Sequence, residues 1–437
     1  MKQKKRLLFY AGSCHIIGGD SKYLFDLINH LDPERYEMML YADENHLFEK
    51  RASEWLRKDV SIKYLPTLPE IFAPDLTDLL IDFLERSPLT RSLKLSFFLK
   101  KIPPGENLKR RLFNYFLKTI LFREYIHSVK NFLLFVNVFR KENPDIFFFN
   151  NGGYPGKEAG IIALLAARLM KIPKIVMSFH NIPPKRGLFR LFNRIYDIIT
   201  DNCCNVVIAA SENLRQDIIR KRGISPHLVH TIYCGIEDRI LPNESEKKEM
   251  RRKLDLKSSD YVLGICGNLD EDRKGHTILF DGIAKIVDRT PDIKLLVIGG
   301  AARERIGYLK EYVKKLGIAD HVRFLNHIPD VHSVNCIFDV AVVPSCGDEA
   351  TPYTIKEGAR AGKPVITTTA GGCLYGIADQ KTGLLVDPGN PDALARAVLY
   401  LYENRSIGES MGFRGRSYFL ENFLLDNKVR EHEALLS

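Results

Sequence analysis

Short apolar runs alternate with helix-like stretches along most of this chain, and the alternation leaves few folds open. In the first half, each apolar run is followed by a glycine-rich or polar turn and then by a stretch with helical spacing. Strands alternating with helices in this way form a parallel sheet covered by helices on both faces. The first half is therefore predicted to be a Rossmann-like α/β domain. The predicted strands are 7–11, 36–41, 144–149, 174–179, 206–209 and 228–233, with helices at 21–30, 159–170 and 211–222.

The alternation starts again after a polar stretch, 243–259, which is rich in Glu and Lys and is expected to be a solvated connector. We therefore expect two Rossmann-like domains, 1–240 and 241–409, followed by a helical tail, 410–437, that crosses back to the first. Open α/β sheets bind ligands at the carboxyl ends of their strands, so the expected site is a cleft between the domains. The second series has predicted strands at 261–266, 294–298, 322–325, 340–343, 364–367 and 383–386, with helices at 276–289, 303–316, 354–361 and 391–403.

One segment, residues 66–141, fits neither series and carries most of the net positive charge. The whole chain has 64 Lys and Arg against 54 Asp and Glu, whereas residues 86–130 alone hold 11 basic and two acidic residues. Basic helices that also carry Leu and Phe bind anionic membrane surfaces, so this insertion is predicted to be helical and to reach a membrane. Alternatively, its apolar face packs on the first domain while its charges face water. Nucleic acid is not expected as a partner, because no recognisable reading module accompanies the charge.

The eight cysteines are scattered without a C-x-x-C pair, so neither a zinc site nor a disulfide framework is predicted. Free thiols in a reducing compartment are the simpler interpretation. The basic start of the chain is followed by an apolar run, 7–11, that is too short for a signal peptide. No window approaches the ~18 uninterrupted apolar residues of a membrane helix. We therefore expect a cytoplasmic protein, with peripheral attachment to the inner face of the cell membrane as a further expectation.

Two glutamates eight positions apart, Glu349 and Glu357, form the most informative motif. They span the turn that leads from a predicted strand, 340–343, into a helix that begins near Thr354. A helix N-terminus offers free N–H groups and the positive end of its dipole, which suit a diphosphate. A carboxylate in the first turn can accept hydrogen bonds from a ribose diol, as in dinucleotide sites. Alternatively, Thr354-Ile-Lys-Glu357 forms a capping box, and Glu349 is a solvated loop residue.

This motif and its surroundings resemble those of the retaining GT-B glycosyltransferases of family 4, also called glycosyl transferases group 1. The resemblance covers most of the chain outside residues 66–141. It implies the GT-B fold, in which two Rossmann-like domains face each other across a cleft, and a nucleotide-diphosphate sugar as donor. The matching segments are Val342-Val-Pro-Ser345, Ala361-Gly-Lys-Pro-Val-Ile366, Gly267-Asn-Leu269, Lys274-Gly275, Leu295-Leu-Val-Ile-Gly299, Gly371-Gly372, Gly383-Leu-Leu-Val-Asp-Pro388, Gly18-Gly19, His180, Ser211 and Tyr233-Cys-Gly-Ile236.

The resemblance also implies roles for individual residues. Glu357 would hold the donor ribose, Glu349 would contact the transferred sugar, and Lys274 would neutralise the departing diphosphate. Gly19 would let the backbone approach the phosphates, and His180 would lie beside the donor sugar. No metal and no cofactor are expected, because the nucleotide-diphosphate sugar is a co-substrate. The expected catalytic residues are Glu349, Lys274 and His180, and the expected donor-binding residues are Gly19, Asn268, Arg273, Lys274, Thr354 and Glu357.

Several of these positions have simpler interpretations. Lys274 can be an exposed lysine screened by water, the glycine pair at 18–19 a tight turn, and His180 a structural histidine. Three sites also depart from the family pattern and allow weaker diphosphate binding, an unusual donor or a degenerate site. Asn268 replaces an arginine, with Arg273 as a substitute, Ala350-Thr-Pro352 replaces Gly-Phe-Gly, and Tyr375 replaces a glutamate. Asp270-Glu-Asp272 spells the D-x-D metal motif of another glycosyltransferase architecture, and we expect a solvated loop there instead.

The predicted activity is hexosyl transfer to an acceptor hydroxyl, with retention at the anomeric carbon and without a metal. A lipid-linked or surface-polysaccharide glycan of the cell envelope is the expected acceptor, given the basic insertion. The alternatives are a non-catalytic GT-B subunit that binds sugars and a nucleotide-sugar epimerase. A nicotinamide dehydrogenase is disfavoured, because no G-x-G-x-x-G follows either first strand. The sequence does not identify the donor base, the sugar, the acceptor or the new linkage.

Overall fold

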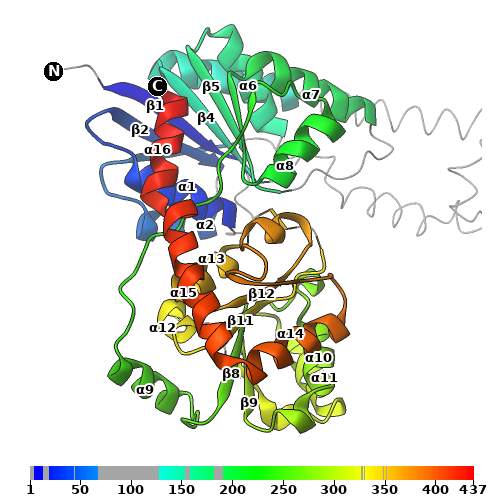
Figure 1. The fold of residues 1–437 in the computed structure, drawn as a ribbon. Coiled ribbons are helices and arrows are strands. Elements are labelled where there is room, and N and C mark those ends of the chain that lie inside the picture. Colours follow the sequence, from blue (N-terminus) through cyan, green and yellow to red (C-terminus); the bar gives the residue numbers. More distant parts are fainter. Residues whose placement is uncertain are drawn as a thin grey trace, which may run out of the picture.

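Two parallel β-sheets, one from each half of the chain, organise the protein (Figure 1). The computed structural model describes residues 4–12, 19–43, 45–66, 127–152, 158–181, 190–325, 328, 330–347, 349–350 and 352–437. Over these residues the first sheet has seven strands, ordered β3-β2-β1-β4-β5-β6-β7, and the second has six, ordered β10-β9-β8-β11-β12-β13. The predicted fold of two Rossmann-like α/β units is therefore confirmed.

The first sheet is centred on β1 (Lys5–Ala11), which pairs with β2 (Tyr36–Asp43) on one side and β4 (Ile146–Asn151) on the other. Phe9 and its partner Phe148 are completely buried, and their rings lie 5.2 Å apart. Parallel strands that are covered on both faces have continuous apolar sequences, and these runs allowed the strands to be predicted. The other elements are α1 (Gly19–His30), α2 (His46–Trp55), β3 (Ser61–Leu65), a helix at 127–142, α6 (Glu158–Leu169), β5 (Lys174–Phe179), α7 (Arg190–Cys203), β6 (Val206–Ala209), α8 (Glu212–Asp217), the π-helix η1 (Ile218–Arg222) and β7 (Val229–Thr231).

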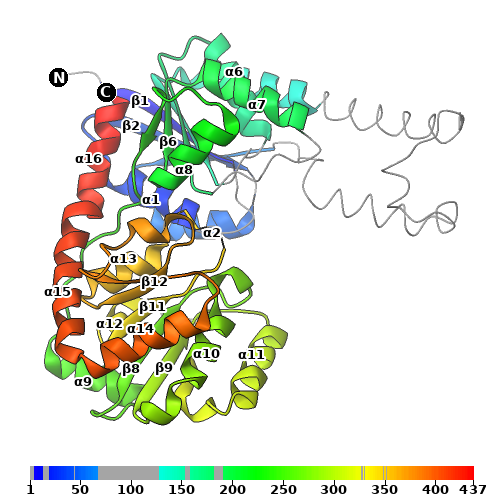
Figure 2. The same cartoon turned by 45° about the vertical axis from the view of Figure 1, so that its right-hand side comes forward.

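The second sheet is centred on β8 (Tyr261–Cys266), which lies between β9 (Ile293–Ile298) and β11 (Val340–Val343). Helices α10 and α14 pack together on one side of this sheet, and α13 packs against β11 on the side toward the first domain (Figure 2). The other elements are α9 (Glu244–Lys253), the 3-10 turn η2 (Asp272–Lys274), α10 (His276–Ala284), α11 (Arg303–Lys315), β10 (Val322–Leu325), α12 (Val331–Asn335), α13 (Tyr353–Arg360), β12 (Val365–Thr368), the 3-10 turn η5 (Gly371–Tyr375), β13 (Gly383–Val386), α14 (Pro391–Glu403), α15 (Arg405–Asn422) and α16 (Leu425–Leu436).

The polar stretch 243–259 is not a simple connector, because it contains helix α9. Asn243 accepts a hydrogen bond from the Glu246 N–H, and the Glu246 carboxylate accepts one from the Asn243 N–H. This reciprocal capping box stabilises the start of a helix that buries none of its residues. The segment is largely exposed, as predicted, but much of it is a helix rather than a connector.

Most of the basic insertion lies outside the described residues, which resume at residue 127. The helix at 127–142 packs on the first sheet through Phe135 and Phe139, and the Phe139 ring lies 4.9 Å from that of Phe147 on β4. Within the described ranges, no helix is both long and apolar enough to cross a bilayer.

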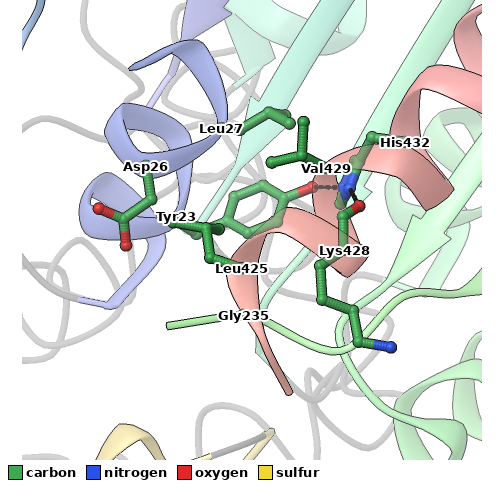
Figure 3. Close-up of a pocket in the computed structure, with 8 residues that line it drawn as sticks. All are labelled: Tyr23, Asp26, Leu27, Gly235, Leu425, Lys428, Val429 and His432. Atoms are coloured by element: carbon green, nitrogen blue, oxygen red, sulfur yellow. Dashed lines mark hydrogen bonds between the residues drawn. The ribbon is translucent and has the colours of Figure 1, made fainter. Parts of the chain in front are cut away.

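The chain passes between the two halves twice, and the two passages lie side by side. The Ile236 N–H donates to the Phe423 carbonyl at 3.0 Å, and the Leu425 N–H donates to the Ile236 carbonyl at 3.1 Å. Helix α15 stays on the second unit, while α16 lies along α1 of the first (Figure 2). At this junction the Tyr23 hydroxyl lies 2.5 Å from His432 Nε2, beside a small cavity (Figure 3).

Candidate functional site

In each sheet the chain changes direction between two central strands. From β8 it runs outward through β9 and β10, and it then returns to β11 on the other side of β8. In the first sheet, β1 and β4 flank the corresponding point. Loops that leave such a pair of strands diverge and open a crevice at the carboxyl ends, where α/β sheets bind ligands. Lys274 follows β8 and Glu349 follows β11, so the topology brings them together across 75 positions of sequence.

A buried carboxylate lies at the centre of this crevice. Glu349 is 7 % exposed, and its Oε1 atom lies 2.6 Å from both Lys274 Nζ and Arg273 Nη1. Ser345 Oγ donates to the same oxygen at 3.3 Å. A buried carboxylate is stable only when it is paired, and here two cations and a hydroxyl pair with it. The alternative of a solvated Glu349 is therefore wrong.

The two cations differ in how firmly they are held. Arg273 also pairs with Glu271, so its guanidinium bridges two carboxylates. Lys274 has an ion pair with Glu349 alone among the described residues, and its side chain is 23 % exposed. An anion that entered the crevice would therefore compete with a single carboxylate for the Lys274 ammonium. The simpler interpretation of Lys274 as a lysine screened by water does not fit this geometry.

Glycines hold the loops of the crevice in place. Gly275 has φ +76°, and a Cβ atom there would lie 2.0 Å from the Pro344 carbonyl oxygen. A Cβ on Gly372 would lie 1.5 Å from the Ala350 carbonyl oxygen, and the Gly372 N–H donates to the Glu349 carbonyl at 2.5 Å. Only glycine allows these backbones to approach so closely. The lysine and the glutamate are thus positioned by backbone packing as well as by their own ion pair.

Helix α13 presents an uncapped N-terminus to the same crevice. Its N-cap residue is Pro352, which makes no side-chain capping hydrogen bond, and Thr354 lies inside the first turn. The alternative of a capping box at Thr354 is therefore wrong. The carboxylate of Glu357, which is half-buried, has no hydrogen bond to any described residue. It lies near the end of β8, where burial and then the Glu357 charge raise the pKa of the Cys266 thiol. The first-turn N–H groups and this carboxylate are both able to bind a ligand.

The first domain meets α13 at the start of α1. The Tyr353 hydroxyl donates to the Gly19 carbonyl at 3.3 Å, and a Cβ on Gly19 would lie 3.1 Å from Tyr353 Cε2. The N-terminal turns of α1 and α13 therefore face each other, with the Tyr353 ring between them. Gly18, the other member of the glycine pair, lies outside the described residues.

His180 follows β5 and is 8 % exposed. Its Nε2 atom lies 2.9 Å from Asn150 Oδ1, and its ring centre lies 4.3 Å from that of Tyr23. Burial, with His432 and Lys356 nearby, lowers the pKa of His180 to about 3. The imidazole is therefore neutral at physiological pH. Its Nδ1 atom has no hydrogen-bond partner within the described structure, so it remains able to bind a further group.

Asn268 lies outside the charge cluster and shapes its own loop. Its Oδ1 atom accepts a hydrogen bond from the Asp270 N–H at 3.1 Å, and its amide donates to Glu271 at 3.3 Å. The acidic D-x-D side chains are likewise held by protein groups, since Asp270 accepts from the Ala302 N–H and Asp272 pairs with Arg305. In the part of the chain that the structure describes, no three potential ligand side chains gather to hold a metal ion.

Three residues of the site were not predicted, namely Ser345, Tyr353 and Lys356. Ser345 could have been inferred, because the Pro-Ser pair before Glu349 was part of the matching motif. Lys356 occupies a helical position next to Ile355 and three before Ala359, both of which are buried. A lysine on such an apolar face is a signal that the sequence does contain.

Both halves of the chain match sequence models of known protein families. Residues 260–404 match the sequence model described as glycosyl transferases group 1, and residues 103–239 match the one described as glycosyltransferase family 4. The two matches together cover more than half of the chain. The chain belongs to glycosyltransferase family 4. The resemblance inferred from its motifs is therefore confirmed, as is the GT-B fold that this family implies.

Individual relatives are more distant. The chain is 28 % identical over 246 residues to a GDP-mannose-dependent α-(1-6)-phosphatidylinositol monomannoside mannosyltransferase of Mycolicibacterium smegmatis, an alignment that covers 54 % of this chain and 63 % of that protein. It is 26 % identical over 297 residues to the capsular polysaccharide biosynthesis glycosyltransferase CapM of Staphylococcus aureus. That alignment covers 66 % of this chain and 75 % of CapM. The crystal structure of Anabaena HepE in complex with UDP superposes with a TM-score of 0.73 at 17 % identity, covering 99 % of both chains.

Proposed function

We propose that this protein is a retaining glycosyltransferase that moves a sugar from a nucleotide-diphosphate sugar to an acceptor hydroxyl. The observation that carries the proposal is the cluster of Lys274, Arg273 and Glu349 at the point where the second sheet changes direction. Placed cations and uncapped N–H groups at such a point suit a diphosphate. The start of α1 across the cleft, at Gly19, supplies the opposing wall.

In this proposal, electrostatics at the leaving group dominate the catalysis. The C1–O bond to the diphosphate breaks as negative charge develops on the departing oxygen, and Lys274 with Arg273 stabilises that charge. Glu349 then exchanges Lys274 for a hydroxyl of the transferred sugar. Glu357 accepts hydrogen bonds from the ribose diol, which fixes the donor relative to the acceptor.

Retention is proposed to follow from attack of the acceptor on the same face that the diphosphate leaves. The acceptor oxygen bonds to C1, and its proton passes to the departing phosphate oxygen. A carboxylate that is paired with Arg273 and hydrogen-bonded to the sugar is a poor nucleophile, which disfavours a covalent intermediate on Glu349. His180 is neutral and offers a hydrogen bond to the sugar rather than a charge.

A Glu357→Gln substitution tests the ribose assignment. We expect kcat/KM for the donor to fall about 10- to 100-fold, because hydrogen bonds to a charged acceptor contribute about 1.5–3 kcal/mol each. The cognate donor is first identified from the rise in Tm that UDP- and GDP-sugars produce, and initial transfer rates are then measured. Glu403→Gln is the matched control, because Glu403, the last residue of α14, is exposed and pairs with Arg289. A folded Glu357→Gln protein that transfers sugar at the wild-type rate would contradict the assignment.

The acceptor is proposed to be a lipid-linked or surface-polysaccharide glycan, reached at an anionic membrane surface. The relatives named for phosphatidylinositol mannoside and capsular polysaccharide synthesis support this choice, as does the basic segment 86–130. In flotation, we expect most of the protein to rise with vesicles containing anionic lipid and little to rise with zwitterionic vesicles. Salt at 0.5 M should abolish the difference, because electrostatic attraction extends only a few ångströms at that ionic strength. Equal flotation with both vesicles would remove the membrane from the proposal.

A further inference from the structure

A lysine with no ion-pair or hydrogen-bond partner among the described residues is buried between the two domains. Lys356 of α13 is 1 % exposed, and its Nζ atom has no hydrogen-bond partner among the described residues. The amine instead lies 5.0 Å from the ring centre of Tyr353 and 5.6 Å from that of Phe423. A buried ammonium without a paired anion is costly, and contacts with aromatic rings recover only part of that cost. An apolar side chain would be more stable at this position.

The neighbouring lysines do not share this lack of a partner. Lys22 of α1 pairs with Asp26 at 2.6 Å, and Lys428 of α16 pairs with Glu431 at 2.6 Å. Burial lowers the pKa of Lys356 to about 8, while Cys234 and Glu357 raise it and Lys428 and Lys22 lower it by smaller amounts. His180, which follows β5, also lies close enough to the amine for the Lys356 charge to lower its pKa. The groups that face Lys356 are therefore Glu357 on its own helix, Lys22, Lys428, His180 and Cys234 on other elements, and the Tyr353 ring.

The position of the amine indicates which group it would bind. Helical side chains lean toward the N-terminus of their helix, over the residue three or four positions earlier. Lys356 accordingly reaches the ring of Tyr353, the first residue of α13, and so lies beside the turn whose N–H groups are uncapped. In this structure the Tyr353 ring separates the amine from the start of α1 at Gly19. An anion bound at this helix N-terminus would take the place of the ring and meet the amine.

We propose that Lys356 is a further ligand of the donor, binding a phosphate oxygen of its diphosphate between the N-terminal turns of α13 and α1. The inference rests on the proposed function and specifies how the diphosphate is held. Tyr353 occupies the position in the absence of the nucleotide and turns aside when the nucleotide binds. Lys356 thus lowers the stability of the free protein and raises its affinity for the donor.

A Lys356→Met substitution should change stability and affinity in opposite directions. Methionine matches the length and apolar stem of lysine, so Tm should rise, while the dissociation constants of UDP and GDP should increase about tenfold. Lys428→Met is the matched control, because that lysine is also buried, at 8 % exposure, but is paired with Glu431. It should not raise Tm, and it should change nucleotide affinity less than twofold. A Lys356→Met protein with unchanged nucleotide affinity would overturn the inference.

Proton uptake provides a second readout that needs no variant. At pH 8 the Lys356 amine is about half protonated in the free protein, and a bound diphosphate would hold it fully protonated. Calorimetric titration of wild type with UDP or GDP, in two buffers of different ionisation enthalpy, should therefore show uptake of about half a proton. Binding without uptake would overturn the role of Lys356 and leave the proposed function intact. If neither nucleotide binds the wild-type protein, the proposed function fails, and this inference fails with it.

Discussion

A Lys274→Met protein is expected to transfer sugar about 100- to 1000-fold more slowly than wild type. Removing one placed group that stabilises charge in the transition state commonly costs this much. The lysine contacts Glu349 at 2.6 Å in the free protein and is proposed to contact the departing diphosphate during the reaction. Because the charge on the leaving group grows as the C1–O bond breaks, kcat should fall more than the KM of the donor rises. Initial rates at saturating and limiting donor concentration separate the two constants.

The control for this experiment lies on the same segment of chain. Lys285, at the end of α10, pairs with Asp392 at 2.7 Å and is about half exposed. Lys285→Met removes an identical charge from the second domain and should leave both constants unchanged. Glu349 keeps Arg273 and Ser345 as partners in the Lys274→Met protein, so the loop should stay folded. Wild-type kcat in a folded Lys274→Met protein would contradict the proposed role.

The strands were predictable because both sheets are parallel and buried on both faces. Six predicted strands have the same bounds in the structure, namely 174–179, 206–209, 261–266, 322–325, 340–343 and 383–386. Two of the elements that the sequence did not reveal bury little apolar surface. Edge strand β3 buries only Leu65, and helix α12 is five residues long. Hydrophobic periodicity cannot mark an element that has no apolar face.

Candidate residues of the site could be named from the sequence, but their geometry could not. The motif identified Glu349, Glu357 and Lys274 as residues that could bind a donor, yet their contacts depend on which strands lie next to each other. The alternative of a capping box at Thr354 is wrong because the N-cap residue of α13 is Pro352, two positions earlier. The burial of Lys356 depends on Phe423 and on α16, which approach from the far end of the chain. A local pattern carries no information about such contacts.

Arg222, in the first domain, is another residue whose contacts could not be predicted from the local sequence. The sequence places it at the end of a predicted helix, where a basic residue usually faces water. In the structure that helix ends as a π-helix, and Arg222 is 1 % exposed. Its Nε atom lies 3.0 Å from Oδ1 of Asp197 on α7, which is itself 4 % exposed. The pair ties η1 to α7 beneath the surface of the first domain.

An Arg222→Met protein is therefore expected to lose about 3–5 kcal/mol of unfolding free energy, because removal of one partner leaves the other charge buried. Burial raises the pKa of Asp197 to about 6 even with Arg222 beside it. A carboxyl whose pKa is raised by folding binds its proton more readily in the native state, so lowering the pH from 7 to 5 should reduce the loss. Denaturant unfolding at both pH values measures the loss of unfolding free energy. Arg220→Met, at an exposed neighbouring position, is the control. Adding Asp197→Asn should restore part of the stability, and a loss below about 1 kcal/mol at pH 7 would show that the pair contributes little.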